Sequence, residues 1–377
     1  MQIVLLMHNW FIDMAAVFTG SLICVSLFIP LIISICNDKG LFDAKSLGRG
    51  QNIPRLGGVT FLPVAVLAVM SVADVMDMDT SMLYGGLGML LIFIIGIIDD
   101  VKGLDYNTKL IVQSIGVLMV ISGGVCNGFM GTLCGMGGAA PYLGFVLSMV
   151  LMLLIINAMN LIDGIDGLAS MMSLLPLGVF AWIFYLDGDY IGAVLSVAFA
   201  GTVTAFLYYN LSAGKNSHSR IFMGDTGSLT IGFVLAFLTM RICGKASLPG
   251  VFSNMHPLWV AFSVLSVPSL DAVRVFLERL LSGTNPFLSD RRHVHYMLQD
   301  IGMGAHAVLA LLSALSATFE LCGILAARYV DVSKIISAEM IAYAVLTGIL
   351  HKIRTYHLSS FTVKYGKRNI IQEDSKA

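Results

Sequence analysis

Apolar runs of about twenty residues, the length a helix needs to cross a bilayer core, recur along most of the chain. Hydrophobic residues make up 57% of the 377 residues. Charged residues make up only 12%, about half of what a soluble domain carries. The pattern therefore predicts an all-α polytopic membrane protein.

We expect about eleven transmembrane helices (ten to eleven), near residues 14–36, 56–75, 81–98, 109–124, 142–160, 167–186, 191–209, 228–243, 257–280, 305–327 and 336–352. In this division, residues 1–352 form a single integral membrane domain. Residues 353–377 form a basic cytoplasmic tail that is expected to be partly disordered.

The basic residues predict the orientation of these helices. No Lys or Arg precedes the first apolar run, so we expect an uncleaved first helix with its N-terminus outside. In that topology 18 of the 22 basic residues lie on the inner side, and the outer side holds only Arg241, Lys245, Arg328 and Lys334. Cytoplasmic loops carry such an excess of positive charge, which supports this orientation.

A polar stretch from Asn157 to Gly167 separates two of the apolar runs. It contains Asn160 and two carboxylates, Asp163 and Asp166, whose three-residue spacing places them on one face of a helical turn. Carboxylates at membrane depth are costly and usually mark an ion or substrate site. The alternative, a polar loop between helices, is weakened by three further polar stretches on the same predicted side.

Asp99 and Asp100 end one apolar run, and Lys109 follows ten residues after Asp99. Adjacent carboxylates repel each other unless a cation or a proton intervenes. The pair and the lysine are therefore candidates to handle a metal ion and an anion. Solvated charge in a short loop is the alternative interpretation.

Asp225 lies between two glycines just before another apolar run, where a metal ligand near a helix N-terminus is expected. Helix capping by Asp225 or Thr226 is the alternative. Phe222 is a candidate to stack on a base, although a lone Phe more often packs in a core.

The last polar stretch contains Arg291, Arg292, His293 and His295. Guanidinium groups match the geometry of phosphate oxygens, so we favour binding of an anionic substrate over a zinc site at the two histidines. Outside these stretches, Asp271, Arg274 and Glu278 have three- and four-residue spacings that predict an ion-pair ladder on one helix. For Glu320 we expect a packing or interfacial role.

Together, the acids, bases and glycine turns on one membrane face predict a site for Mg²⁺ and a multiply charged phosphate. Mg²⁺ is typically held by few carboxylates together with substrate phosphates. The chain has no G-x-x-x-x-G-K-[ST] loop, so ATP-driven chemistry is not indicated.

Four motifs occur in an order that resembles the polyprenyl-phosphate N-acetylhexosamine-1-phosphate transferases, most closely the bacterial branch that uses undecaprenyl phosphate. They are Asp99-Asp100, Asn157 to Gly167, Phe222-Met-Gly-Asp225-Thr-Gly and His293-Val-His295. In one respect the chain departs from the branch, because Tyr296 stands where a further histidine often closes the last motif.

The resemblance implies a role for each matching residue. Asp225 would be the principal Mg²⁺ ligand, assisted by Asn160, with Mn²⁺ as a substitute metal. Asp99, Asp100 and Lys109 would be the catalytic residues near the reacting phosphates. The substrate-binding residues would be Asn160, Asp163, Asp166, Phe222, Arg291, Arg292, His293 and His295. Among these, Asp166 and Phe222 would hold uracil, and Asp163 has no specific role.

The implied reaction transfers N-acetylhexosamine-1-phosphate, by default GlcNAc-1-phosphate, from a UDP-sugar to undecaprenyl phosphate and releases UMP. It would start the synthesis of a cell-surface glycan such as O-antigen, common antigen or teichoic acid. The protein would lie in the bacterial plasma membrane with its site facing the cytoplasm. Nucleic acid is not an expected partner, and a homodimer stays open.

A membrane transporter for a sugar nucleotide or a divalent cation is the alternative from another functional class. Transporter sites tend to lie near the bilayer midplane within repeated halves. Here the motifs cluster at one predicted face and none of them is repeated, which favours the enzyme.

Overall fold

The computed structural model describes residues 2–43, 52–72, 79–125, 140–211, 219–245, 247–253, 255–286, 290–326 and 329–374. In these ranges the fold is helical, and one isolated β-bridge joins Phe42 to Pro54. The prediction of an all-α membrane protein is confirmed. Arg328, predicted on the outer side, lies outside the described residues.

The first part of the bundle comprises α1 (Gln2–Lys39), the 3-10 turn η1 (Gly57–Thr60), α3 (Phe61–Val72), α4 (Thr80–Lys102), α5 (Tyr106–Ser122), α7 (Ala140–Ile162), α8 (Leu168–Asp187), α9 (Tyr190–Leu211) and α10 (Gly224–Cys243). The second part comprises η5 (Gly250–Phe252), α11 (Pro257–Val264), α12 (Ser266–Leu281), α13 (Val294–Asp300), α14 (Ala305–Ala326) and α15 (Val332–Asp374).

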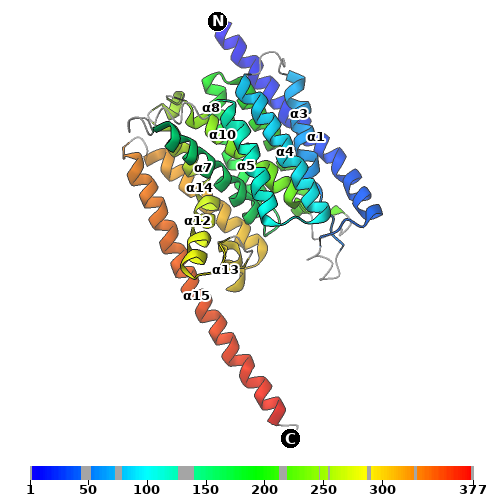
Figure 1. Ribbon diagram of the computed structural model, residues 1–377, viewed down its shortest axis with the longest axis vertical. Helices are drawn as coiled ribbons and strands as arrows, with labels where there is room; N and C mark the ends of the chain where they lie inside the picture. Colours follow the sequence, from blue (N-terminus) through cyan, green and yellow to red (C-terminus); the bar gives the residue numbers. More distant parts are fainter. Residues whose placement is uncertain are drawn as a thin grey trace.

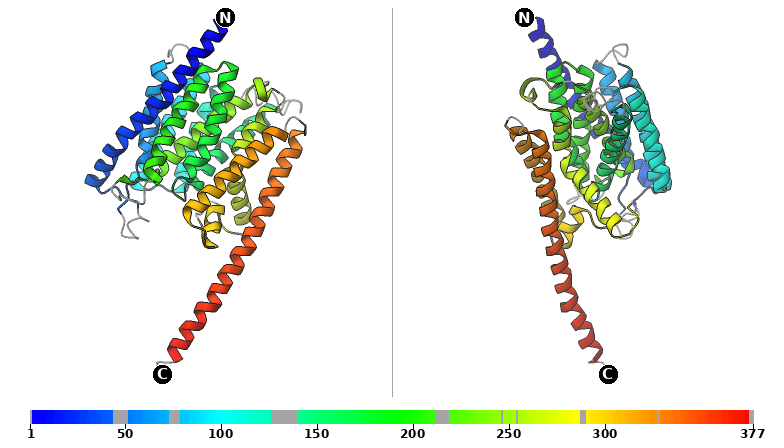
Figure 2. Two further views of the ribbon diagram at one scale, coloured as in Figure 1. Left: turned by 180° about the vertical axis from the view of Figure 1, so that it is seen from behind. Right: turned by 60° about the vertical axis from the view of Figure 1, so that its left-hand side comes forward.

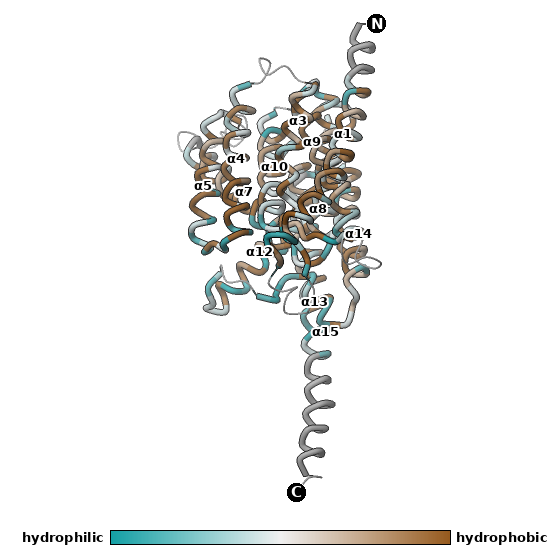
Figure 3. Tube along the Cα trace, turned by 90° about the vertical axis from the view of Figure 1, so that its right-hand side faces the viewer, coloured by the Kyte–Doolittle hydropathy of each residue, from teal (hydrophilic) through white to brown (hydrophobic). Residues whose placement is uncertain are grey.

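Within the described residues, eight helices are long and apolar enough to cross a membrane, or nine if the bent pair α11 and α12 counts as one span. The segment Gly57–Val72 and α5 are apolar but shorter. The two ends of the chain lie at opposite ends of the bundle (Figure 1). Brown colouring follows the middle of the helices, and teal gathers around α13 and the adjoining part of α15 (Figure 3).

Helix α10 lies at the centre of the bundle (Figure 2) and packs against α4, α7 and α8. It is buried along nearly its whole length. Burial on all sides explains why this helix is apolar all round instead of carrying one apolar stripe. The residues at its two ends are therefore fixed by neighbours on every side.

At the C-terminal end of α10, Arg241 binds acidic residues near the ends of neighbouring helices. Its guanidinium group donates to both carboxylate oxygens of Asp189, with Nε–Oδ2 and Nη2–Oδ1 distances of 2.6 and 3.1 Å, and Nη1 donates to Asp79 at 2.8 Å. Asp79 is also the N-cap of α4, where its side chain accepts from Met82 N. This ion-paired end lies one helix length from Asp225.

At the opposite end of the bundle, near the N-terminus of α10, a tight turn joins α4 to α5. Gly103 ends α4 with a φ of 70°, and Asp105 caps α5 by accepting from the backbone N–H of Thr108 at 3.0 Å. The two helices therefore run side by side. The last turn of α4 faces the first turn of α5, which places Asp99 beside Lys109.

The predicted helix at 257–280 is broken, which corrects the sequence interpretation. Helices α11 and α12 meet at Leu265 with a bend of 77°. Pro268 explains the break, because proline has no N–H to donate to the carbonyl of Val264 and its ring clashes with that carbonyl. Val264 is the last residue of α11.

Other boundaries also differ from the prediction. Helix α1 begins at Gln2 instead of residue 14, and α10 begins at Gly224 instead of 228. Helix α13 lies in a segment predicted to be a loop. Helix α15 runs from Val332 to Asp374, whereas the last predicted helix covers residues 336–352.

Candidate active site

The first turn of α10 begins at a position that requires glycine. Gly224 has a φ of 72°, and a Cβ atom there would lie 2.2 Å from the carbonyl oxygen of Arg55 and 2.5 Å from Oδ2 of Asp100. A side chain would therefore be strained by the backbone and would also clash. Asp225 follows directly, inside the first turn of α10.

Asp100 of α4 caps α10 across the bundle. Its Oδ1 accepts from the backbone N–H of Asp225 at 2.8 Å. Its Oδ2 accepts from the backbone N–H of Thr226 at 2.9 Å and from the Thr226 hydroxyl at 2.5 Å. The alternative interpretation, in which Asp225 or Thr226 caps this helix, is thus excluded. Both residues are donors to a carboxylate supplied by another helix.

Asp99 points to a different set of partners. Its Oδ2 lies 2.8 Å from Nζ of Lys109, and its Oδ1 accepts from the backbone N–H of Leu104 at 2.6 Å. Adjacent residues of a helix do not share a face. This geometry explains how two neighbouring carboxylates avoid each other, one as a helix cap and one as the partner of a lysine.

Asp225 completes what we call the carboxylate cluster, which consists of Asp99, Lys109, Asn160 and Asp225. Nζ of Lys109 lies 3.4 Å from Oδ2 of Asp225. The side-chain amide of Asn160, near the end of α7, donates to Oδ1 of Asp225 at 2.7 Å and to Oγ of Ser228 at 2.9 Å. The Asp225 side chain is 37% exposed and that of Asp99 only 4%. Asp225 is therefore the carboxylate that an incoming ligand can reach.

Among the described residues, no group of three or more His, Cys, Asp or Glu side chains is placed to hold a metal ion. The arrangement suits Mg²⁺ better than a metal that needs a complete protein cage. Mg²⁺ is usually bound by one or two carboxylates and takes its other ligands from water and phosphates. Asp225 offers one accessible carboxylate with Asn160 beside it.

The turn between α7 and α8 contains Asp163 and Asp166. Asp166 forms an ion pair with Arg220, whose guanidinium carbon lies 5.2 Å from the centre of the Phe222 ring. Burial raises the pKa of Asp166, and the positive charge of Arg220 opposes that rise. The structure therefore brings the predicted pair Asp166 and Phe222 together through an arginine that links them.

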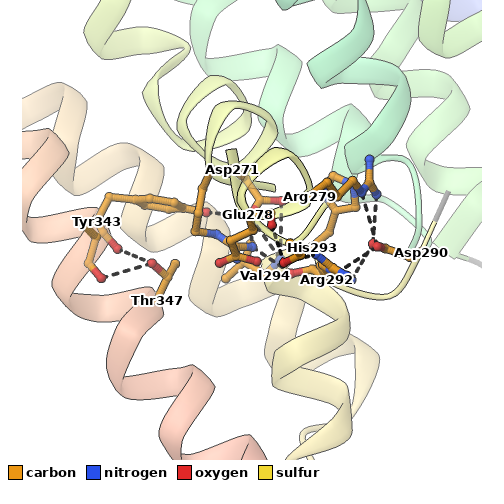
Figure 4. A network of polar contacts seen from close by, with 12 residues as sticks. Asp271, Glu278, Arg279, Asp290, Arg292, His293, Val294, Tyr343 and Thr347 are labelled. Atoms are coloured by element: carbon orange, nitrogen blue, oxygen red, sulfur yellow. Dashed lines mark hydrogen bonds and ion pairs between the residues drawn. The ribbon is translucent and has the colours of Figure 1, made fainter. Parts of the chain in front are cut away.

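Residues 290–293 form the loop before α13, and a network of side chains from α12 and α15 contacts this loop (Figure 4). Oδ2 of Asp271 lies 2.8 Å from Nδ1 of His293, and Oδ1 accepts from the Tyr343 hydroxyl at 3.0 Å. Arg274 binds Asp271 and Glu278 at 2.7 and 2.6 Å, which confirms the predicted ion-pair ladder. The ladder thus also fixes the start of α13.

His295 joins this loop to the turn after α7. A Cβ atom at Gly164 would lie 2.2 Å from Nε2 of His295, so the imidazole sits directly on the glycine. Burial lowers the pKa of His295 to about 4, and the ring is neutral at pH 7. The His293 and His295 rings lie nearly parallel, with centres 5.8 Å apart.

The two predicted arginines are paired with acids near them. Arg291 is exposed, binds Asp300 at 2.8 Å and lies over the Tyr296 ring. Arg292 binds Asp290 at 3.0 Å. Both guanidinium groups therefore have acidic partners outside the carboxylate cluster.

Sequence reasoning missed several residues that shape this site. Asp271 was expected in the ladder but not as the partner of His293, and Tyr343, Ser228 and Gly164 were not identified. Only Gly164 gave a signal, as part of the Asp-Gly-Ile-Asp-Gly stretch. Glu320 is 6% exposed within α14, which agrees with the expected packing role.

The two neighbouring acids should respond differently to the same substitution. Asp100→Asn puts an NH₂ group or a weaker acceptor against three donors, so we expect a loss of about 2 kcal/mol of stability. Asp99→Asn should be much milder, because Lys109 keeps Asp225 as a partner and one of two nearby negative charges is removed. Thermal unfolding of the purified variants in detergent measures the difference. Equal destabilisation, or a larger loss at Asp99, would contradict these assignments.

Comparisons with known proteins cover the part of the chain that carries this cluster. A family model described as glycosyl transferase family 4 matches residues 82–243, from α4 to the end of α10. A decaprenyl-phosphate N-acetylglucosaminephosphotransferase of Mycobacterium leprae is 34% identical over 134 residues, 33% of this chain and 32% of the relative.

Two further relatives are named undecaprenyl-phosphate alpha-N-acetylglucosaminyl 1-phosphate transferase. The protein of Haemophilus influenzae is 29% identical over 39% of this chain and 40% of its own length. The protein of Yersinia pestis is 24% identical over 51% and 50%. The aligned part of the chain thus spans a third to a half of these relatives. These matches agree with the resemblance that the motifs predicted: residues 82–243 match glycosyl transferase family 4, and the similar proteins are named as polyprenyl-phosphate N-acetylglucosamine-1-phosphate transferases.

Proposed function

We propose that the protein transfers N-acetylhexosamine-1-phosphate, by default GlcNAc-1-phosphate, from a UDP-sugar to undecaprenyl phosphate. The observation that carries this proposal is the accessible Asp225 carboxylate, held between Lys109 and Asn160 where three helices meet. The printed names of the relatives support the same reaction class. As in our expectation from the motifs, the product would begin a cell-surface glycan.

Mg²⁺ fits the carboxylate cluster, with Asp225 as its anionic ligand and Asn160 beside it; Mn²⁺ would be a substitute. When bound, the ion would neutralise charge on the diphosphate of the sugar nucleotide. Lys109, positioned by Asp99, is the side chain that would contact a phosphate oxygen.

The other substrate groups would be held at the edges of the cluster. Asp166 and Phe222 would hold uracil, with Arg220 fixing the carboxylate. Arg291 and Arg292 would exchange their acidic partners for phosphate oxygens, which accept the same forked hydrogen bonds. His295, neutral at pH 7, would supply hydrogen bonds and not charge.

For the chemical step we propose direct attack by the lipid phosphate. An oxygen of undecaprenyl phosphate forms a bond to the β-phosphorus of the UDP-sugar, the bond from that phosphorus to the bridging oxygen breaks, and UMP leaves. Asp99 and Asp100 are buried, and their oxygens are bound by Lys109, by the backbone of Leu104 and by the first turn of α10, which favours a structural role for both over a nucleophilic one. Positioning and charge neutralisation would then supply most of the catalysis.

Asp225→Asn tests the metal assignment. Because the ion loses its anionic ligand, transfer should fall by about 100-fold and require more Mg²⁺. The assay measures UMP release from UDP-GlcNAc with undecaprenyl phosphate across a range of Mg²⁺ concentrations. Asp38→Asn, an exposed acid at the end of α1, is the matched control and should behave as the native protein. Near-normal turnover of the Asp225 variant at limiting Mg²⁺ would exclude the assignment.

Direct attack makes a separate prediction about the donor alone. Labelled UDP-GlcNAc and Mg²⁺, incubated with enzyme free of lipid phosphate, should give no stoichiometric release of UMP. Adding undecaprenyl phosphate should then start the reaction. A covalent route would instead release one UMP per enzyme and leave label on the protein, and that result would overturn direct attack.

We further propose that the cluster faces the cytoplasm of a bacterial plasma membrane, as the positive-inside bias predicts. In a background with all six cysteines replaced, we expect Ser282→Cys to be protected from an impermeant maleimide in intact cells. Ser247→Cys, at the opposite end, should be labelled. Both serines are exposed, so accessibility depends on the side of the membrane. The reverse labelling would invert the proposed topology.

A further inference from the structure

A groove of about 890 Å³ lies between α12 and α15 at the end of the bundle that holds the loop 290–293. On one wall, Leu270, Val273, Leu277 and Leu281 form a stripe along α12. On the other, α15 contributes apolar and small residues that include Met340, Ala344 and Gly348. We call this cavity the α12–α15 groove.

Cations gather at the inner end of the groove. Its lining includes Arg274, Arg292, Lys352 and Arg354. The three arginines form ion pairs, Arg274 with Asp271 and Glu278, Arg292 with Asp290, and Arg354 with Asp300. Lys352 is exposed and forms no ion pair with any residue that the structure describes. The groove therefore combines long apolar walls with a mouth at which the ammonium group of Lys352 is open to an anion.

The groove is separate from the carboxylate cluster, and Arg292 is the one proposed substrate-binding residue in its lining. None of the four residues of the carboxylate cluster lines it. Helix α12 also packs against α7, which carries Asn160, and its residues Asp271, Val275 and Arg279 are buried outside the groove lining. A molecule in the groove would thus lie behind the loop that holds His293 and would not reach Asp225.

We propose that the α12–α15 groove binds an anionic phospholipid of the inner leaflet. An acyl chain would lie along the apolar walls, and the phosphate would contact Lys352 at the mouth. Basic residues next to the membrane attract anionic lipids in this way. A zwitterionic lipid offers the same chains without the net charge, so the mouth selects against it.

Such a lipid would support the loop from outside. Tyr343 lines the groove and donates to Asp271, which holds His293 (Figure 4). Arg274, also in the lining, donates to the backbone carbonyl of Arg292 at 2.8 Å. The bound lipid would therefore shield hydrogen bonds that position the loop, while taking no part in the transfer.

Gly348→Phe tests the site without disturbing the fold. A Cβ atom at Gly348 meets nothing within 4 Å, and the ring would fill the groove. Gly178→Phe is the matched control, because Gly178 is also a helical glycine with nothing within 4 Å and does not line the groove. Native mass spectrometry of the full chain, with phosphatidylglycerol or phosphatidylcholine added, measures occupancy.

We expect one tightly held phosphatidylglycerol on the native protein and on the Gly178 variant, and its loss from the Gly348 variant. Lys352→Gln should weaken binding about fivefold, as expected for one cation near an anionic lipid. Equal retention by the Gly348 variant, or equal binding of phosphatidylcholine, would overturn the proposal.

Displacement of the lipid by undecaprenyl phosphate, one for one and only when Gly348 is present, would assign the groove to the acceptor instead and also overturn the proposal. Lipid binding is measured without a UDP-sugar. A failure of the lipid-binding proposal is therefore distinguishable from a failure of the proposed transfer function.

Discussion

Asp100 is the side chain on which the geometry of the site depends. It is buried, and its two oxygens accept three hydrogen bonds from the first turn of α10. A helix N-terminus leaves donors without intrahelical partners, and in an apolar bundle water cannot satisfy them. By supplying the acceptor from α4, Asp100 fixes the central helix against its neighbour. Asp225 then stands beside Lys109 and Asn160 without having to cap its own helix.

Because Asp100 caps α10 and Asp225 does not, the carboxylate cluster carries more negative than positive charge. Two carboxylates, Asp99 and Asp225, share one nearby cation, Lys109. The excess negative charge favours a further cation, and the more exposed of the two acids is the one left open to it. A multiply charged diphosphate would be repelled by the acids alone, and the proposed Mg²⁺ would offset that repulsion.

The sequence predicted those features that depend on local patterns. Apolar runs located most of the membrane-length helices, and the i, i+3, i+4 spacing located the Asp271–Arg274–Glu278 ladder. Contacts between distant segments were not predictable in this way. Asp100 and Asp225 are separated by 125 positions, and nothing in the sequence signals that one caps the helix of the other. Pro268 gave a local signal for the broken helix, but it was masked because α11 and α12 together are apolar enough to be taken for one span.

Helix α12 shows why the break matters. A straight helix from residue 257 to 280 would carry Asp271 along the direction of α11, whereas the 77° bend turns it toward α15 and the loop. After the bend, α12 has two tasks. Its polar residues, Asp271 and Arg274, hold His293 and the carbonyl of Arg292, and its apolar stripe forms a wall of the groove. Because the two sets share one short helix, the bend that brings Asp271 to His293 also places the apolar stripe beside α15.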